Sequence, residues 1–188
     1  MSSLSPSFRV GSQLIEIIRH HQHASRRDAK RIAIELLELV DIQNPRDVAR
    51  LYPHEISGGM AQRVVIAVAL AGNPQLIVAD EPTTALDVSV QMQVLELLRN
   101  LAASRGLSVL IVTHDWGVVA DICDSAIVMY AGQVVEAAAT GEIFSAARHP
   151  YTRALRAADP HAPRESDRLR AIPGQVPPPG DWPAGCRF

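Results

Sequence analysis

The chain of 188 residues contains a single lysine, Lys30, which stands between Ala29 and Arg31. A phosphate-binding loop of the form G-x-x-x-x-G-K-[ST] needs a lysine directly after a glycine. No Gly-Lys pair occurs in the sequence, so these 188 residues do not contain such a loop. Any phosphate that the chain binds must therefore be held by other groups.

Long hydrophobic runs and cysteines are scarce as well. The longest run, residues 64–71, falls far short of the roughly 20 apolar residues that a membrane-spanning helix needs. The first residues lack the basic start and the apolar core of an export signal. Two widely separated cysteines, Cys123 and Cys186, cannot form the disulfide framework of a small secreted domain. These absences favour a protein of the cell interior.

Charge and composition exclude one further class of function. The formal net charge is -2, so bulk charge gives no attraction to nucleic acid. Hydrophobic residues make up 47% of the chain against 20% charged residues, which is typical of a globular domain with a hydrophobic core. We therefore expect no nucleic-acid partner.

Hydrophobic periodicity predicts that the first part of the chain is helical. Apolar residues recur at helical spacing over residues 10–18 and again over residues 32–40, and Asp28 fits the start of the second helix. A buried helix is predicted over residues 59–72. It ends at Gly72-Asn73-Pro74, because glycine permits the cap and proline cannot continue the helix.

Later segments alternate between short apolar strands and helices, which indicates an α/β fold. Because the strands are apolar throughout, we expect a parallel sheet that helices cover on both faces. Prolines recur between residues 172 and 185 and deny the backbone donors that a helix or strand needs, so this segment should be extended. The predicted strands are residues 76–79, 107–112, 125–130 and 134–137, and the predicted helices are residues 88–103, 142–147 and 151–158.

The segment Ser57-Gly58-Gly59 directly precedes the buried helix. Free amides and the positive dipole end at a helix N-terminus stabilise a phosphate, and glycines let the phosphate approach the backbone closely. Alone, such a segment is more often a plain helix cap. The motifs further along the chain decide between the two interpretations.

Acidic residues follow the first predicted strand at its carboxyl end, the edge at which parallel α/β sheets bind ligands. Neighbouring side chains on an extended chain point to different sides, which permits two roles. We expect Asp80 to hold a magnesium ion, directly or through water, and Glu81 to orient and deprotonate a water that attacks a terminal phosphate. His114 follows the strand at 107–112 in the same way, and its imidazole can form a hydrogen bond with a phosphate oxygen.

In this order, the segments resemble the later part of an ATP-binding-cassette (ABC) ATPase. The resemblance implies ATP and Mg²⁺ as cofactors, Glu81 as the catalytic glutamate and His114 as the switch histidine. The implied fold is α/β, the later part of a P-loop NTPase (RecA-like) ABC nucleotide-binding domain with a helical subdomain and an irregular Pro-rich C-terminal extension. By the same resemblance, the nucleotide-binding residues are Ser57, Gly58, Gly59 and Gln62 of the signature and Asp87 of the D-loop (85–87), and Asp80 of Walker B (76–80) is the magnesium residue.

Flanking residues resemble one subgroup of that family. Tyr52-Pro53-His54-Glu55-Ile56 before the signature and Met60 within it resemble ATPases that power dipeptide, oligopeptide and nickel importers, and His149-Pro150-Tyr151-Thr152 resembles their carboxyl extension. One cysteine, Cys186, cannot hold an iron–sulfur cluster, so we assign no metal to it. The expected domains are a helical and signature subdomain (1–73, with the signature helix at 59–72), a partial RecA-like ATPase core (74–140) and a C-terminal extension (141–188).

Two cassettes pair head to tail in that family, so the signature of one faces the nucleotide held by the other. As written, the chain lacks the phosphate loop and the loop glutamine. We therefore expect an ABC-type ATPase by family that is inactive as an isolated chain. We favour an internal methionine at position 1, with the natural protein beginning upstream, and a split or disrupted gene is the competing explanation.

The leading functional hypothesis is the motor subunit of an importer, which couples ATP binding and hydrolysis to uptake of peptides or nickel. Its expected partners are a second ABC ATPase subunit, transmembrane permease subunits that dock on residues 2–40 and, indirectly, a substrate-binding protein. This assembly implies a peripheral location at the cytoplasmic face of the cell membrane. The alternatives are a non-hydrolytic cassette that lends only its signature to an intact partner and, ranked last, a soluble ABC protein of DNA repair or translation, because heptad runs and a second signature are missing.

Overall fold

The computed structural model describes residues 4–84, 86–159 and 171–188. The chain forms two compact units, residues 1–112 and residues 113–188. Ala85 of the expected D-loop, and Ser2 and Ser3 of the expected docking region, lie outside the described residues. Within the described part of the chain, no helix combines the length and the apolar character that crossing a bilayer requires. The division into residues 1–73, 74–140 and 141–188 stays a prediction.

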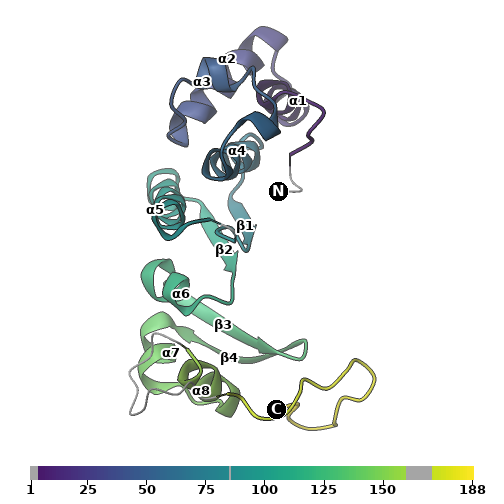
Figure 1. The fold of residues 1–188 in the computed structure, drawn as a ribbon, viewed down its shortest axis with the longest axis vertical. Coiled ribbons are helices and arrows are strands. Elements are labelled where there is room, and N and C mark those ends of the chain that lie inside the picture. The colour runs from purple at the N-terminus through teal and green to yellow at the C-terminus, as the bar shows by residue number, and fades with distance from the viewer. Residues whose placement is uncertain (1–3, 85, 160–170) are drawn as a thin grey trace. The chain divides into compact units, whose positions relative to one another are not determined.

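The first unit opens with a layer of helices (Figure 1). The first helix, α1, buries Val10, Leu14 and Ile18, which recur every four residues and so share one face. The next helix, α2, begins before Asp28, the predicted start, because the hydroxyl of Ser25 accepts the N–H of Asp28 and caps the helix. The bounds are α1 Val10–Gln22, α2 Arg26–Leu39, α3 Pro45–Val48, the 3₁₀ turn η1 Pro53–Glu55 and α4 Gly58–Leu70.

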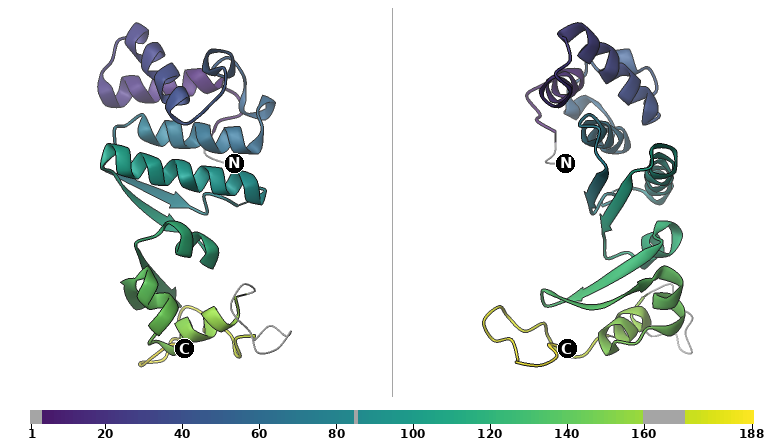
Figure 2. Two further views of the ribbon diagram at one scale, coloured as in Figure 1. Left: turned by 90° about the vertical axis from the view of Figure 1, so that its left-hand side faces the viewer. Right: turned by 180° about the vertical axis from the view of Figure 1, so that it is seen from behind.

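Two strands and a connecting helix complete the first unit. Strands β1 (Leu76–Asp80) and β2 (Ser108–Val112) pair in parallel, so that Asp80 lies opposite Val112. Helix α5 (Val88–Arg105) joins them and runs beside α4 (Figure 2). The predicted α/β alternation and the parallel pairing of these two strands are confirmed.

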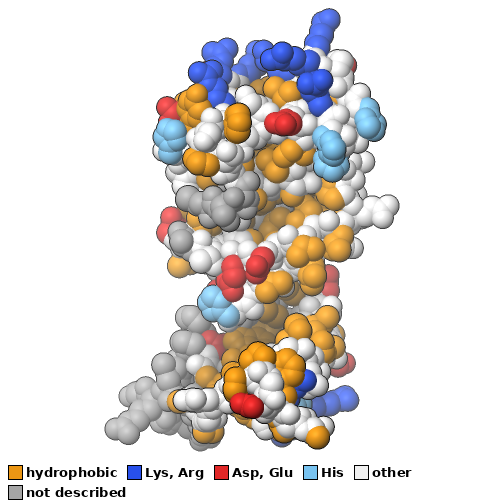
Figure 3. Space-filling model, turned by 90° about the vertical axis from the view of Figure 1, so that its right-hand side faces the viewer, with side chains coloured by type: hydrophobic (Ala, Val, Ile, Leu, Met, Phe, Trp, Pro, Cys, Tyr) orange, Lys and Arg blue, Asp and Glu red, His pale blue; other side chains and the backbone are white. Residues whose placement is uncertain are grey.

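The expectation that helices cover both faces of the parallel sheet is wrong for the described residues. Ile77 packs into the hydrophobic core and is 6% exposed, whereas its neighbour Val78 is 62% exposed. Leu110, the register partner of Val78, is 48% exposed. Successive residues of a strand alternate between faces, so one face of β1 and β2 is packed and the other is uncovered. Figure 3 shows hydrophobic side chains at the surface on the side facing away from α5.

The second unit is built around a β-hairpin. Strands β3 (Ser125–Tyr130) and β4 (Gln133–Ala139) pair antiparallel. Their turn lies at Ala131 (φ 47°) and Gly132 (φ 78°), as the sequence predicts. Two successive positive φ values give the turn a twist that matches the strands. The helices of this unit are α6 Trp116–Ile122, α7 Thr140–Ala146 and α8 Pro150–Ala157.

The described tail, residues 171–188, forms neither helix nor strand, as its prolines predict. Its end is nevertheless held on the hairpin. The guanidinium of Arg187 donates a hydrogen bond to the carbonyl of Ala131. The ring of Phe188 lies 5.4 Å from that of Tyr130 and 5.3 Å from that of Tyr151, measured between centroids. The tail is therefore extended and docked on its own unit.

Candidate functional site

The start of α4 carries the predicted signature residues. Ser57 has extended backbone angles and caps the helix, because its hydroxyl accepts the N–H of Met60 at 3.3 Å. The first backbone amides of a helix have no acceptor within the helix, and Gly58 and Gly59 occupy these positions. Gln62 lies on the next turn of α4 and is half-buried. The structure therefore contains a glycine-opened helix end with the geometry that favours an anion.

The start of α5 lies against the start of α4. The carboxylate of Asp87 caps α5 by accepting the N–H of Val90 at 3.0 Å. A β-carbon added to Gly59 would lie 2.6 Å from Cγ1 of Val90, a separation that β-carbon contacts essentially never show. The first turns of the two helices are therefore in direct contact, and each is capped by a predicted nucleotide-binding residue.

The predicted carboxylate pair lies at the end of β1. Asp80 is the last residue of the strand and its side chain is exposed. The sequence suggested that Glu81 continues the extended chain of the strand. The structure differs, because the φ of Glu81 is 47°, in the left-handed region. Its N–H donates to the carbonyl of Val112 at 2.9 Å, and its carboxylate accepts the hydroxyl of Thr84 at 2.9 Å. The glutamate is therefore fixed by a turn that follows the strand.

His114 belongs to the second unit, just after the end of β2, and its side chain is exposed. The next residue, Asp115, caps α6 by accepting the N–H of Gly117 at 2.8 Å and that of Val118 at 3.4 Å. The N–H of Asp115 in turn donates to the hydroxyl of Thr113. That His114 shares a ligand with Glu81 stays a prediction.

Arg63 is a residue of this region for which the sequence predicts no role. It follows Gln62 on α4, and its side chain is 13% exposed. Its guanidinium donates to the carbonyl of Val40 at the end of α2, to the carboxylate of Asp41 at 3.2 Å and to the amide oxygen of Gln93 on α5 at 3.2 Å. Arg63 thereby ties α4 to the helices on both sides. The sequence signal that could have indicated this role is that Arg63 is the single arginine of a largely apolar helix.

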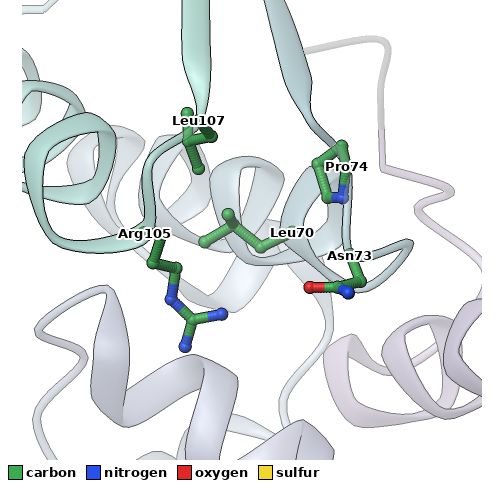
Figure 4. Close-up of a pocket in the computed structure, with 5 residues that line it drawn as sticks. All are labelled: Leu70, Asn73, Pro74, Arg105 and Leu107. Atoms are coloured by element: carbon green, nitrogen blue, oxygen red, sulfur yellow. The ribbon is translucent and has the colours of Figure 1, made fainter.

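The first unit also contains a hollow of about 210 Å³, which lies away from the predicted nucleotide-binding residues. Leu70 ends α4 and Arg105 ends α5, so the hollow is at the opposite ends of these helices from Ser57 and Asp87. The C-terminal ends of α4 and α5 present carbonyl groups and negative dipole ends there, and both disfavour the binding of an anion. Its lining residues are Leu70, Asn73, Pro74, Arg105 and Leu107 (Figure 4).

Among the described residues of the second unit, Cys123, Glu136 and Tyr151 have displaced pKa values, and they lie outside the predicted site. Burial and the charge of Asp124 raise the pKa of Cys123. Burial and the neighbouring Tyr130 raise the pKa of Tyr151. For Glu136, burial acts to raise the pKa, but hydrogen bonds from the amides of residues 148 and 149 and the charge of His149 outweigh burial and lower it.

Comparisons with known proteins agree with this fold. Residues 2–84 match the family model described as ABC transporter, and residues 135–188 match the one described as oligopeptide/dipeptide transporter, C-terminal region. The dimeric post-hydrolysis state of the ATP-binding cassette MJ0796 bound to ADP and Pi is 32% identical, with a TM-score of 0.63 over 73% of this chain and 59% of that chain. The fold is therefore that of part of an α/β nucleotide-binding cassette.

Curated relatives match over the entire sequence. The chain is 47% identical to the oligopeptide transport ATP-binding protein AppD and 49% identical to the oligopeptide transport ATP-binding protein OppD, both of Bacillus subtilis. The alignments cover 100% of this chain but 57% and 53% of the two relatives, so the chain spans little more than half of their length. The chain belongs to the ABC transporter family, in the group of oligopeptide and dipeptide transport ATP-binding proteins.

Proposed function

We propose that this chain is part of the ATP-hydrolysing motor of an importer for di- and oligopeptides or for nickel. The observation that carries the proposal is the glycine-opened start of α4, capped by Ser57 and packed against the Asp87-capped start of α5. Both helix ends present amides and positive dipole ends at one place. Relatives that match the entire chain are named as oligopeptide transport ATP-binding proteins, which supports peptides as the substrate class.

Ser57, Gly58, Gly59 and Gln62 would bind the terminal phosphate of an ATP held by a second cassette. The phosphate-binding loop for each site must come from outside these 188 residues, in the same polypeptide or in another one. Amides at a helix start need no rearrangement to accept the charge that develops on the phosphate. Asp87, whose carboxylate caps α5, would keep the neighbouring helix end in place.

Asp80 would hold Mg²⁺ and Glu81 would act on water. The exposed carboxylate of Asp80 at the carboxyl end of β1 fits magnesium, which prefers hard oxygen ligands. When bound, Mg²⁺ neutralises negative charge on the phosphates. Glu81 would orient the attacking water and accept its proton, with its carboxylate held by Thr84. His114 would donate a hydrogen bond to the terminal phosphate.

The proposed partners are a second ABC ATPase subunit and the transmembrane permease subunits, with a substrate-binding protein acting on the outer side. This arrangement puts the chain at the cytoplasmic face of the cell membrane. The solved cassette that it resembles is a dimer, which supports pairing with a second cassette.

Uptake measurements in cells that carry the gene test the proposal. Glu81→Gln should lower the uptake of a labelled peptide, or of nickel, by about 100-fold or more, because general-base catalysis is lost. Glu96→Gln, an exposed glutamate on α5, is the matched control and should leave uptake unchanged. If cells with Glu81→Gln take up peptide and nickel as fast as cells with the unmodified chain, the proposal is contradicted.

A non-hydrolytic cassette that lends its signature is the second candidate, favoured by a formed signature helix in a sequence without Gly-Lys. The test uses an intact relative whose own signature serine is replaced by arginine. Adding this chain should restore ATP hydrolysis by that relative, and Ser57→Arg should prevent the restoration. Ser104→Arg is the control. Ser104 lies at the C-terminal end of α5, away from the Asp87 cap, so this variant should still restore ATP hydrolysis. If the unmodified chain restores nothing, lending is excluded.

A further inference from the structure

Gly59 and Val90 approach each other closely between the two capped helix ends. A β-carbon at position 59 would lie 2.6 Å from Cγ1 of Val90 and 3.8 Å from its Cβ and Cγ2. One methyl group therefore occupies the space that any side chain at position 59 would need. Because Val90 is β-branched and sits in a helix, its χ1 rotamer is nearly fixed, so this methyl cannot turn away cheaply.

The contact joins residues that hold the predicted phosphate-binding end. Gly59 is the second residue of α4, two positions after the capping Ser57. Val90 is the third residue of α5, and its N–H is the one that the carboxylate of Asp87 accepts. A shift of Val90 therefore moves the Asp87 cap, and a shift of Gly59 moves the Ser57 cap. The contact between Gly59 and the Val90 methyl therefore couples the two helix ends.

We propose that Val90 is a positioning residue for the phosphate-binding end of α4: its Cγ1 methyl sits in the notch that Gly59 leaves and sets the separation of the Ser57 and Asp87 caps. The inference depends on the proposed function, which makes this helix end a phosphate site. It gives Gly59 a second role beside access for the phosphate, namely the close approach of α5.

The test is a double-variant cycle on Gly59 and Val90 in the full chain. Gly59→Ala should lower the unfolding temperature by roughly 3–10 °C, because an added carbon is forced against Val90. Gly59→Ala combined with Val90→Ala should recover most of this loss, because the clashing methyl is gone. Gly141→Ala is the matched control, since Gly141 is also the second residue of its helix and an added β-carbon meets nothing within 4 Å.

Uptake in cells separates positioning from packing. Gly59→Ala should lower uptake by about tenfold or more, since displacement of a binding group by about 1 Å can cost about 100-fold. The combination with Val90→Ala should restore uptake to within about threefold of the unmodified chain, and Val90→Ile, which keeps both γ-carbons on the β-carbon, should behave like valine. A merely structural contact would recover the unfolding temperature without recovering uptake.

Two results would overturn the inference. The first is an unfolding temperature of Gly59→Ala equal to that of the unmodified chain. The second is a double variant that regains stability but not uptake, which would mean that Gly59 acts only through the bound phosphate. Failure of the proposed function is recognised separately, because uptake would then be insensitive to Glu81→Gln.

Discussion

The hydroxyl of Thr84 donates a hydrogen bond of 2.9 Å to the carboxylate of Glu81, three residues earlier in the chain. The N–H of Thr84 also donates to the carbonyl of Glu81 at 3.2 Å, which closes a turn directly after β1. Glu81 has a φ of 47°, a conformation that costs a residue with a β-carbon about 1–2 kcal/mol. Such strain persists where surrounding contacts enforce it, and it is typical of functional residues.

Replacing Thr84 tests whether this turn orients the proposed base. Thr84→Val keeps the shape of the side chain and removes the hydroxyl, so uptake should fall severalfold, and the free energy of unfolding should fall by about 0.5–1 kcal/mol. Thr84→Ser keeps the hydroxyl and should retain both. Urea unfolding and uptake assays measure the two effects. Unchanged uptake in Thr84→Val would show that Glu81 needs no such support.

The uncovered face of β1 and β2 gives a second prediction. Val78 and Leu110 are register partners and are 62% and 48% exposed, so they leave apolar surface in contact with water. Val78→Thr combined with Leu110→Thr should lower the fluorescence of a dye that binds apolar surfaces and should reduce self-association of the chain. The free energy of unfolding should change little, because each side chain is already about half exposed or more.

Ile77→Thr is the control for that experiment. Ile77 lies on the packed face and is 6% exposed, so a hydroxyl there should lower the free energy of unfolding by about 1–3 kcal/mol. A loss of stability in the Val78 and Leu110 variant as large as that in Ile77→Thr would contradict the assignment of the two faces.

Local patterns along the sequence were sufficient to predict most elements. The four-residue spacing of Val10, Leu14 and Ile18 predicts α1, and Ala131-Gly132 predicts the hairpin turn, because each depends on neighbours in the sequence. The start of α2 was placed too late, because either Ser25 or Asp28 can begin a helix and the sequence does not say which caps it.

Features that depend on distant residues were not predictable. The fit of Val90 against Gly59 joins positions 31 residues apart, and the Arg63 hydrogen bond to Gln93 joins positions 30 apart. Neither pair has a local sequence signal. The uncovered face of the sheet was missed for a similar reason, because an apolar strand predicts burial without saying what covers it.

Glu136 predicts a pH dependence of the second unit. Its carboxylate accepts the N–H of Arg148 at 2.7 Å and that of His149 at 3.1 Å, at the start of α8. Burial acts to raise the pKa of Glu136, but these bonds and the charge of His149 lower it below its ordinary value. A lowered folded-state pKa contributes stability that is present above the pKa of the unfolded chain and is lost as the pH falls through the folded-state pKa.

The unmodified chain should therefore lose stability on acidification more steeply than Glu136→Gln. Thermal unfolding between about pH 7 and pH 3 measures the difference in stability. This pH range spans the ordinary glutamate pKa of about 4.3. Glu142→Gln, an exposed glutamate of α7, is the matched control and should follow the unmodified chain. Parallel pH curves for the unmodified chain and Glu136→Gln would contradict the assigned role.

The isolated chain should hydrolyse ATP no faster than background. Asp80 and Glu81 supply the metal and water side of the chemistry, but a water can attack only a phosphate that is held in place, and these 188 residues contain no Gly-Lys loop to hold it. Phosphate release by the purified chain should equal that by Glu81→Gln, with an intact oligopeptide transport relative as the positive control. Steady turnover that disappears in Glu81→Gln would mean that the chain positions ATP by itself, and the phosphate site would then have to be sought among other residues.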